Sequence, residues 1–87
     1  MAEVILPRHL ADLFPGTSRR LETDAATVRE VVAALDRRAP GMGDRLLMAG
    51  PALREHLRVF VDGTAADLDT PVAARSVVQV IMAVSGG

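Results

Sequence analysis

The stretch that decides the fold of this chain is SVVQVIMAV, residues 76–84, which leads through Ser85 into Gly86 and Gly87. Its apolar character on both faces predicts a buried β-strand near the centre of a sheet. Chains normally end in polar residues that fray, but here two glycines follow a core strand almost directly. Because glycine lacks a Cβ, its backbone can enter a channel too narrow for other residues. The stretch therefore predicts a core strand that carries a slender, flexible tail, and a simple frayed end is the alternative.

The clearest helix is expected over Thr27–Arg38. One face of this segment is apolar at helical spacing, at Val28, Val31, Val32 and Leu35. Thr27 and Glu30 have the spacing of a capping box at its start, and Pro40-Gly41 ends the pattern. Because two adjacent valines lower the intrinsic helix propensity, we expect packing against a sheet to hold this helix.

Alternating apolar residues predict strands at Ala2–Leu6 and Leu57–Asp62, and a weaker pattern at Ser18–Thr23 predicts an edge strand. Asp62-Gly63 has the sequence of a tight hairpin turn, after which Ala65–Leu68 is expected to pair briefly. The first and last strands are the most apolar, so we expect them to lie side by side in the middle of the sheet.

Two connections are predicted with less regular structure. His9–Phe14 is expected to form one helical turn, with Leu10, Leu13 and Phe14 on its apolar side. Met42–Leu57 contains two glycines and a proline, so we expect a loop with a helical turn or two.

The predicted order of a hairpin, a helix and further strands indicates an α+β domain, in which a single main helix covers one face of a mixed sheet. The opposite face would carry Ile5, Phe60 and Ile81. A sheet face in contact with water is normally polar, so we interpret these three residues as a docking patch. Scattered surface hydrophobes are the alternative.

Composition limits the functions open to the chain. Its 87 residues make one domain, and the formal net charge of −1 gives no electrostatic case for binding nucleic acid. The basic residues are all arginine and there is no cysteine, so no lysine amine, thiolate or disulfide is available. Without a signal-peptide pattern or an apolar run of about 20 residues, we expect a cytoplasmic protein that does not enter a membrane.

No pattern in the sequence predicts a catalytic centre. His9 and His56 lack further ligands at metal spacing, so no metal site is expected. Asp67 and Asp69 are interpreted as solvated turn residues and not as an acid–base pair. The serines lack a nucleophile-elbow motif, and no glycine-rich phosphate loop is present. We therefore expect that the chain is not an enzyme and that any chemistry takes place on it.

These features together resemble the ubiquitin-like β-grasp sulfur carriers of the ThiS/MoaD family. The resemblance rests on the order ββαββ, on the Asp62-Gly63 turn after a Val-Phe-Val strand, and on the ending Ala83–Gly87. It covers nearly the whole chain and is greatest for the longer CysO-like and MoaD-like members, because Leu6-Pro7 and the long Met42–Leu57 connection fit them. It implies a β-grasp domain over residues 1–84 and a flexible tail over residues 85–87.

The chain also departs from the family pattern in two places. Many members have an Asp-Gly-Asp-type turn where this chain has Ala73–Ser76, and MoaD-like tails often carry a proline where it has Met82-Ala83. Both departures leave the pathway open.

The resemblance further implies a mechanism. An E1-like enzyme, which would itself use ATP and Mg²⁺, adenylates the Gly87 carboxylate, and a sulfur donor converts it to a thiocarboxylate. A sulfur-accepting synthase, of which the chain could be the small subunit, then takes the sulfur for cysteine, molybdopterin or another cofactor. Ser85 and Gly86 would thread the partner's active site while the docking patch holds the domain, and this chain would bind no cofactor. A protein modifier conjugated through Gly87, or a non-covalent interaction module, are the alternatives.

Overall fold

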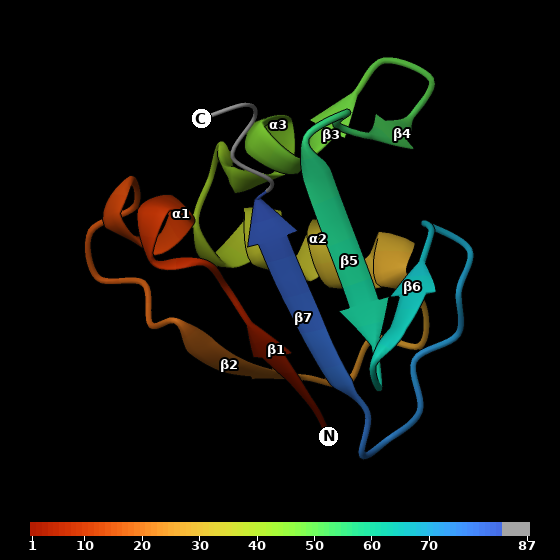
Figure 1. Ribbon diagram of the computed structural model, residues 1–87. Helices are drawn as coiled ribbons and strands as arrows, with labels where there is room; N and C mark the ends of the chain where they lie inside the picture. Colours follow the sequence, from red (N-terminus) through yellow and green to blue (C-terminus); the bar gives the residue numbers. More distant parts are fainter. Residues whose placement is uncertain (83–87) are drawn as a thin grey trace.

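The computed structural model of the protein describes residues 1–82 (Figure 1). Its elements, in chain order, are β1 (Ala2–Ile5), α1 (Arg8–Asp12), β2 (Arg20–Thr23), α2 (Val28–Arg38), α3 (Met42–Leu46), β3 (Leu47–Met48), β4 (Ala52–Leu53), β5 (Leu57–Val61), β6 (Thr64–Ala66) and β7 (Val77–Met82). A five-stranded sheet has the order β2-β1-β7-β5-β6, while β3 and β4 pair separately. Helix α2 crosses one face of this sheet (Figure 1), which confirms the α+β prediction with one main helix.

Strand β7 is the centre of the sheet. It runs parallel to β1, with Val78 opposite Val4, and antiparallel to β5, with Val78 opposite Val61. The other pairings, β1 with β2 and β5 with β6, are antiparallel, so the sheet is mixed as expected. The first and last strands are neighbours, which confirms the predicted central pair. Because β1 and β7 run the same way, both finish at one end of the sheet.

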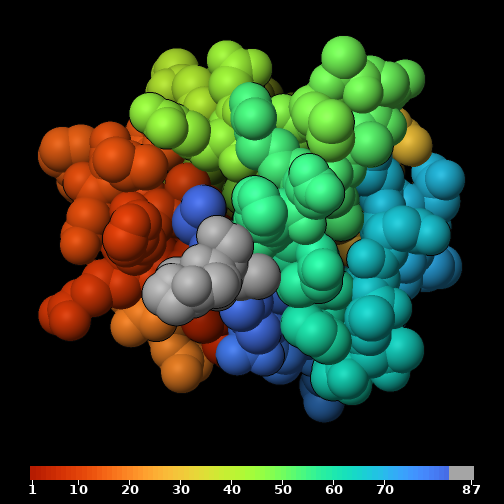
Figure 2. Space-filling view, turned by 45° about the horizontal axis from the view of Figure 1, so that its top comes forward, coloured from red at the N-terminus to blue at the C-terminus, as the bar shows by residue number. Residues whose placement is uncertain are grey.

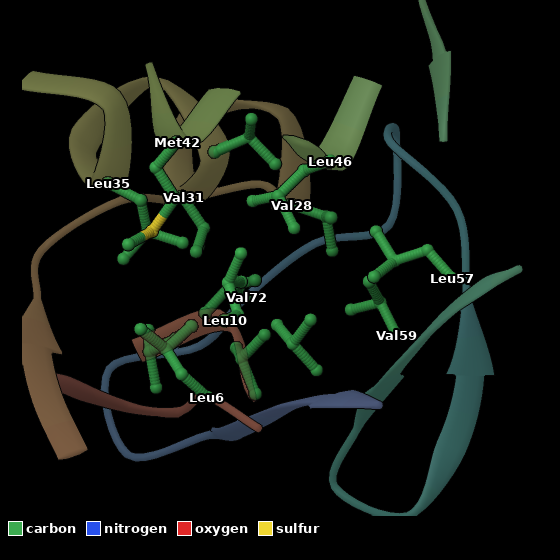
Figure 3. Close-up of a cluster of buried hydrophobic side chains, with 14 of the residues drawn as sticks. Leu6, Leu10, Val28, Val31, Leu35, Met42, Leu46, Leu57, Val59 and Val72 are labelled. Atoms are coloured by element: carbon green, nitrogen blue, oxygen red, sulfur yellow. The ribbon is translucent and has the colours of Figure 1, made fainter. Parts of the chain in front are cut away.

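The core lies between α2 and the inner face of the sheet (Figure 3). The predicted helical stripe is buried, and so are the strand residues expected to face it: Val4, Leu6, Val59, Val61, Val78 and Val80. None of these six is more than 8% exposed, which confirms the predicted register of β1, β5 and β7. Leu10 from α1 and Met42 and Leu46 from α3 close the two sides of the core. Removing this apolar surface from water is the main stabilising contribution to the fold.

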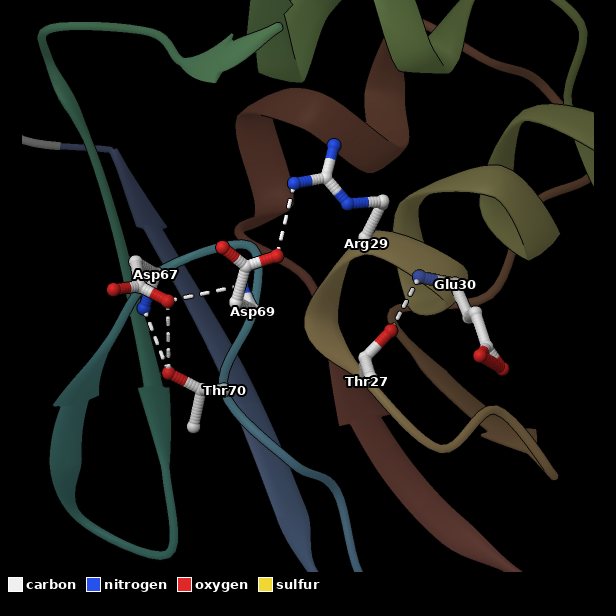
Figure 4. Close-up of polar contacts among 6 residues, drawn as sticks. All are labelled: Thr27, Arg29, Glu30, Asp67, Asp69 and Thr70. Carbon is white, nitrogen blue, oxygen red and sulfur yellow. Dashed lines mark hydrogen bonds and ion pairs between the residues drawn. The ribbon is translucent and has the colours of Figure 1, made fainter.

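The start of α2 is fixed by side-chain hydrogen bonds. Thr27 Oγ1 accepts a hydrogen bond of 3.2 Å from the Glu30 backbone N–H, as the predicted capping box requires (Figure 4). Glu30 Oε1 accepts in turn from the N–H of Ala26, at 3.2 Å, one residue before the predicted partner. Helix α2 begins at Val28, so Thr27 is its N-cap and not its first helical residue.

Two predicted strand starts are corrected by local hydrogen bonds. Strand β2 begins at Arg20 and not at Ser18, because Ser18 Oγ accepts from the Arg20 N–H at 3.2 Å and forms a turn there. Strand β7 begins at Val77 and not at Ser76, whose hydroxyl is occupied by other partners. The strand is described to Met82, and the remainder of the predicted strand lies outside the described residues.

The two connections contain more regular structure than expected. Helix α1 spans Arg8–Asp12, and the prediction that Leu13 faces the core is wrong, because the helix has ended there and Leu13 is 49% exposed. The 42–57 region contains the short helix α3 and the two-residue strands β3 and β4, with Leu47 opposite Leu53. The expectation of a helical turn without a long element is confirmed, whereas the small hairpin was not predicted.

Candidate functional site

The three residues predicted to form a docking patch lie on the sheet face opposite α2. Ile5 and Phe60 are each paired with Gln79, one from β1 and one from β5, so the two apolar side chains flank this residue across the central strand. Ile81 lies two residues further along β7 on the same face and is 40% exposed. The structure therefore places the three residues together on one face. A role for them in binding remains a prediction.

A fourth apolar residue belongs to this surface. Val77 begins β7 on the same face as Gln79 and Ile81 and is 38% exposed. The prediction of a strand buried on both faces named Ile81 but not Val77 as part of an exposed surface, and the outer face of β7 is more exposed than predicted. Strict alternation counted back from Ile81 would have identified Val77. We refer to Ile5, Phe60, Val77 and Ile81 as the outer patch.

Polar residues border the outer patch. Arg20 Nη1 lies 3.3 Å from both carboxylate oxygens of Glu3 across β1 and β2. On the other side Arg58, which is paired with Ile81, directs its Nη1 to the backbone oxygens of Glu55 and Leu57. An apolar centre with a charged rim is the general composition of a protein–protein interface.

The hairpin turn after β5 holds the beginning of β7. Asp62 has a φ of 51° and Gly63 a φ of 84°, as the predicted tight turn requires. The Asp62 carboxylate accepts hydrogen bonds from the Val77 N–H at 2.9 Å and from the Ser76 hydroxyl at 2.8 Å. These donors favour the ionised form, the Val77 N–H most strongly, so they lower the pKa of Asp62 below 3.8. The bonds join residues 14 and 15 apart in the chain and fix where β7 enters the sheet.

The acidic residues of the 67–69 turn have structural partners. Asp67 Oδ1 accepts from the Asp69 N–H at 2.9 Å and from the Thr70 hydroxyl at 3.3 Å (Figure 4). Asp69 Oδ1 lies 3.0 Å from Nη2 of Arg29 on α2, and the Asp69 side chain is 84% exposed. This geometry agrees with the interpretation of both as turn residues and ties the turn to the first turn of α2.

The other predicted site residues follow β7. Ser85, Gly86 and Gly87 lie outside the described residues, and so does the boundary proposed between the domain and its tail. Met82, the last residue described, is paired with Leu57 of β5. Any continuation of the chain therefore starts from the end of the sheet at which β1 also finishes.

Neither histidine belongs to a metal site within residues 1–82. His9 and His56 are both exposed, and no group of three or more possible metal ligands is found in that part of the chain. In the same residues, no helix has the length and apolar character needed to cross a membrane.

The fold, with its mixed sheet around a central parallel pair and one crossing helix, is that of a ubiquitin-like β-grasp domain. The comparison with protein families matches residues 4–87 to the ThiS family, so the chain belongs to the ThiS family. The comparison with curated proteins gave no match.

Solved structures with this fold include a modifier protein and two CysO structures. The chain is similar to small archaeal modifier protein 1 from Haloferax volcanii, with 31% identity, a TM-score of 0.78 and coverage of 99% of this chain and 98% of that one. It also matches a chain of the BexX/CysO complex from Amycolatopsis orientalis, with 24% identity, a TM-score of 0.89 and full coverage of both chains. CysO from Mycobacterium tuberculosis gives 21% identity and a TM-score of 0.84, over 97% of this chain and 100% of that one. The last two similarities establish the fold. Together with the family, these findings identify a ubiquitin-like protein of the sulfur-carrier or modifier type.

Proposed function

We propose that this protein is a sulfur carrier whose reactive group is the carboxylate of Gly87, taken as the terminal residue of the mature chain. The observation that carries the proposal is that the ThiS family match runs from residue 4 to Gly87, so it includes the whole glycine ending. The described domain supports the proposal in a second way, because it presents partly exposed apolar residues on the sheet face opposite α2.

The proposed chemistry uses a carboxylate that is ionised at neutral pH, since an α-carboxyl group has a pKa of about 3.3–3.7. A carboxylate oxygen attacks the α-phosphorus of ATP on an activating enzyme, which gives an acyl-adenylate and pyrophosphate. A sulfide or persulfide sulfur then attacks the activated carbonyl carbon and displaces AMP; a persulfide also requires a thiol to reduce the resulting acyl disulfide. The product is a thiocarboxylate, a soft nucleophile that delivers sulfur to an acceptor on a second enzyme. The carrier contributes the terminus and its placement, while the activating enzyme binds ATP and Mg²⁺.

In this proposal the two glycines and the outer patch have separate tasks. Gly86 has no side chain, so the terminus can pass a narrow channel to the nucleotide. The outer patch holds the domain against the enzyme by burying apolar side chains that are otherwise in contact with water. The likeness to a chain of the BexX/CysO complex supports a partner protein, because that similar chain was crystallised in a complex.

Two variants test these tasks. Gly86→Val should abolish thiocarboxylate formation without changing the urea midpoint, because its added side chain blocks the channel. Normal thiocarboxylation of this variant, measured by mass spectrometry with an E1-like enzyme, ATP and sulfide, would contradict the channel argument.

Phe60→Asp should raise the KM for the carrier, because it places a charge in the outer patch. The matched control is Ala33→Asp, which adds the same charge at an exposed position of α2, on the other side of the domain. Equal KM values for the two variants would exclude the outer patch as the docking surface. Unfolding of Phe60→Asp would instead mean that the residue belongs to the core.

A protein modifier is the second candidate, because the 31% identity with small archaeal modifier protein 1 is higher than that with either CysO structure. It would begin with the same adenylation but end in an amide bond to an amine of another protein. The sulfur acceptor in the carrier proposal is a precursor of cysteine, of molybdopterin or of another cofactor. The CysO folds favour cysteine as the first to be tested.

A further inference from the structure

Charge is distributed unevenly over the domain, although the net charge is only −1. β1 and β7 are parallel and β5 is antiparallel to both, so the connection after β1 and the segment before β5 lie at the end of the sheet where β7 finishes. We call these segments, residues 7–20 and 42–58, the basic end. Figure 2 looks toward it from above and shows the two segments on either side of the end of β7.

The basic end holds six of the ten arginines and three of the eleven acidic residues, a balance of +3. The rest of the chain holds four arginines and eight acidic residues, a balance of −4. Both histidines, His9 and His56, also belong to the basic end. The two segments are therefore net positive and the rest of the chain is net negative, although one acidic residue of the rest, Asp36, contacts Gly43 of the basic end.

A hollow opens in the surface of the basic end. It has a volume of about 300 Å³ and is lined by apolar side chains, Met48, Leu57 and Met82, and by cationic or polar ones that include Arg45, Arg54 and His56. Met48 is 49% exposed, and Met82 is the last residue of β7. The hollow thus combines three apolar side chains with two arginines, one histidine and one acidic side chain, Glu55, beside the last described residue of β7.

Within residues 1–82, only one of the six arginines of the basic end, Arg20, has an acidic partner. The ion pairs found within residues 1–82 join Arg20 to Glu3 and Arg29 to Asp69. Arg8 and Arg45 are exposed and take part in neither pair. Arg54 is in neither ion pair either, but it donates from Nε to the Asp44 backbone carbonyl at 2.8 Å.

We propose that the basic end is a second docking surface, which receives a carboxylate-rich surface of the activating enzyme around the entrance to its nucleotide site. This inference rests on the proposed function, because it concerns the same partner. Opposite charge steers a diffusing partner and raises the association rate, and it orients the positive end toward the acidic surface. The outer patch then provides apolar contact, while the basic end directs the terminus of the chain toward the active site.

The test compares two charge-reversed proteins that carry the same total charge. Arg8→Glu/Arg45→Glu reverses two exposed arginines of the basic end, and Arg37→Glu/Arg75→Glu reverses two exposed arginines elsewhere. Thiocarboxylation by an E1-like enzyme with ATP and sulfide is measured as kcat/KM for the carrier at several salt concentrations. We expect the first variant to lose about tenfold or more at low salt, the second to lose much less, and the difference to shrink at about 1 M salt, where the Debye length is about 3 Å.

The outcomes separate the two proposals. If the unaltered protein forms a thiocarboxylate and the two variants lose activity equally, the basic end is not a docking surface and the proposed function stands. If the unaltered protein forms no thiocarboxylate, the proposed function fails. A separate binding measurement then tests whether the basic end is a docking surface.

That binding is measured by following backbone amide signals in nuclear magnetic resonance spectra as a glutamate–leucine repeat peptide is added. Shifts centred on Arg45, Met48 and His56, and lost in Arg8→Glu/Arg45→Glu, support the proposal. Shifts spread over α2, or stronger binding of a single-stranded DNA oligonucleotide than of the peptide, overturn it.

Discussion

Replacing Val78 by alanine is expected to destabilise the domain by about 2–3 kcal/mol. Val78 is 0% exposed and lies on the central strand, with Val4 on one side and Val61 on the other. The substitution removes two methyl groups, which costs roughly 1.5 kcal/mol of transfer free energy. The cavity left between the strands adds to this cost. For a domain of this size, the midpoint of thermal unfolding should fall by about 10–20 °C.

Val77→Ala is the matched control, because Val77 is the preceding residue of the same strand and faces outward with 38% exposure. It should change the free energy of unfolding by no more than about 0.5 kcal/mol. The chain has neither tryptophan nor tyrosine, so urea unfolding is followed by circular dichroism. Equal costs for the two variants, or a larger cost for Val77→Ala, would refute the assignment of the two faces of β7.

Two further predictions concern the hydrogen bonds of carboxylates. The hydrogen bonds from Val77 and Ser76 lower the pKa of Asp62 in the folded protein. They therefore stabilise the fold fully above pH 3.8, and this stabilisation is lost as the pH falls through the folded-state pKa of Asp62. The stability difference between the unaltered protein and Asp62→Asn should therefore narrow below pH 3.8 in urea titrations, and a gap that stays constant to pH 2 would contradict this assignment. Gly43→Ala should cost about 1–2 kcal/mol, because its Cβ would lie 2.9 Å from Asp36 Oδ1, which accepts from the Gly43 N–H at 2.8 Å. The same change in an Asp36→Ala background should cost little, and an undiminished cost there would show that the carboxylate is not the cause.

The longer elements and their buried faces could be predicted from the sequence, because their apolar residues recur with the period of a helix or of a strand. The stripe of Thr27–Arg38 and the alternation in Leu57–Val61 both describe which face is buried, and the structure confirms both. The neighbouring positions of β1 and β7 also followed from composition, because the most apolar strands are buried on both sides by neighbours, but their parallel direction was not predicted.

The limits of the short elements could not be predicted from apolar spacing alone. Helix α3 starts after Gly41, whose N–H donates to Asp36 Oδ1 at 3.2 Å, and nothing in the local sequence indicates this bond. Ser76 resembled the first residue of a strand, but its hydroxyl is committed to Asp62, 14 residues earlier in the chain. Leu13 had helical spacing, but α1 ends before it and leaves it exposed.

The candidate site also has one part that the sequence largely predicted, the outer patch, and one part that it did not, the basic end. Period-two alternation identified three residues of the outer patch, and strict use of the same rule would have added Val77. The basic end was not predicted, because its charges come from two segments far apart in sequence that meet only when β1 and β7 lie parallel. Within each segment the arginines resemble ordinary surface residues.

The most direct test of the central claim is the intact mass of the protein after incubation with an E1-like enzyme, ATP and sulfide. We expect an ATP-dependent mass gain equal to the exchange of one oxygen for one sulfur, located by fragmentation at Gly87 and absent when Gly86 and Gly87 are deleted. An unchanged mass, or a terminus joined to an amine of another protein without any sulfur product, would contradict the claim that this protein carries sulfur.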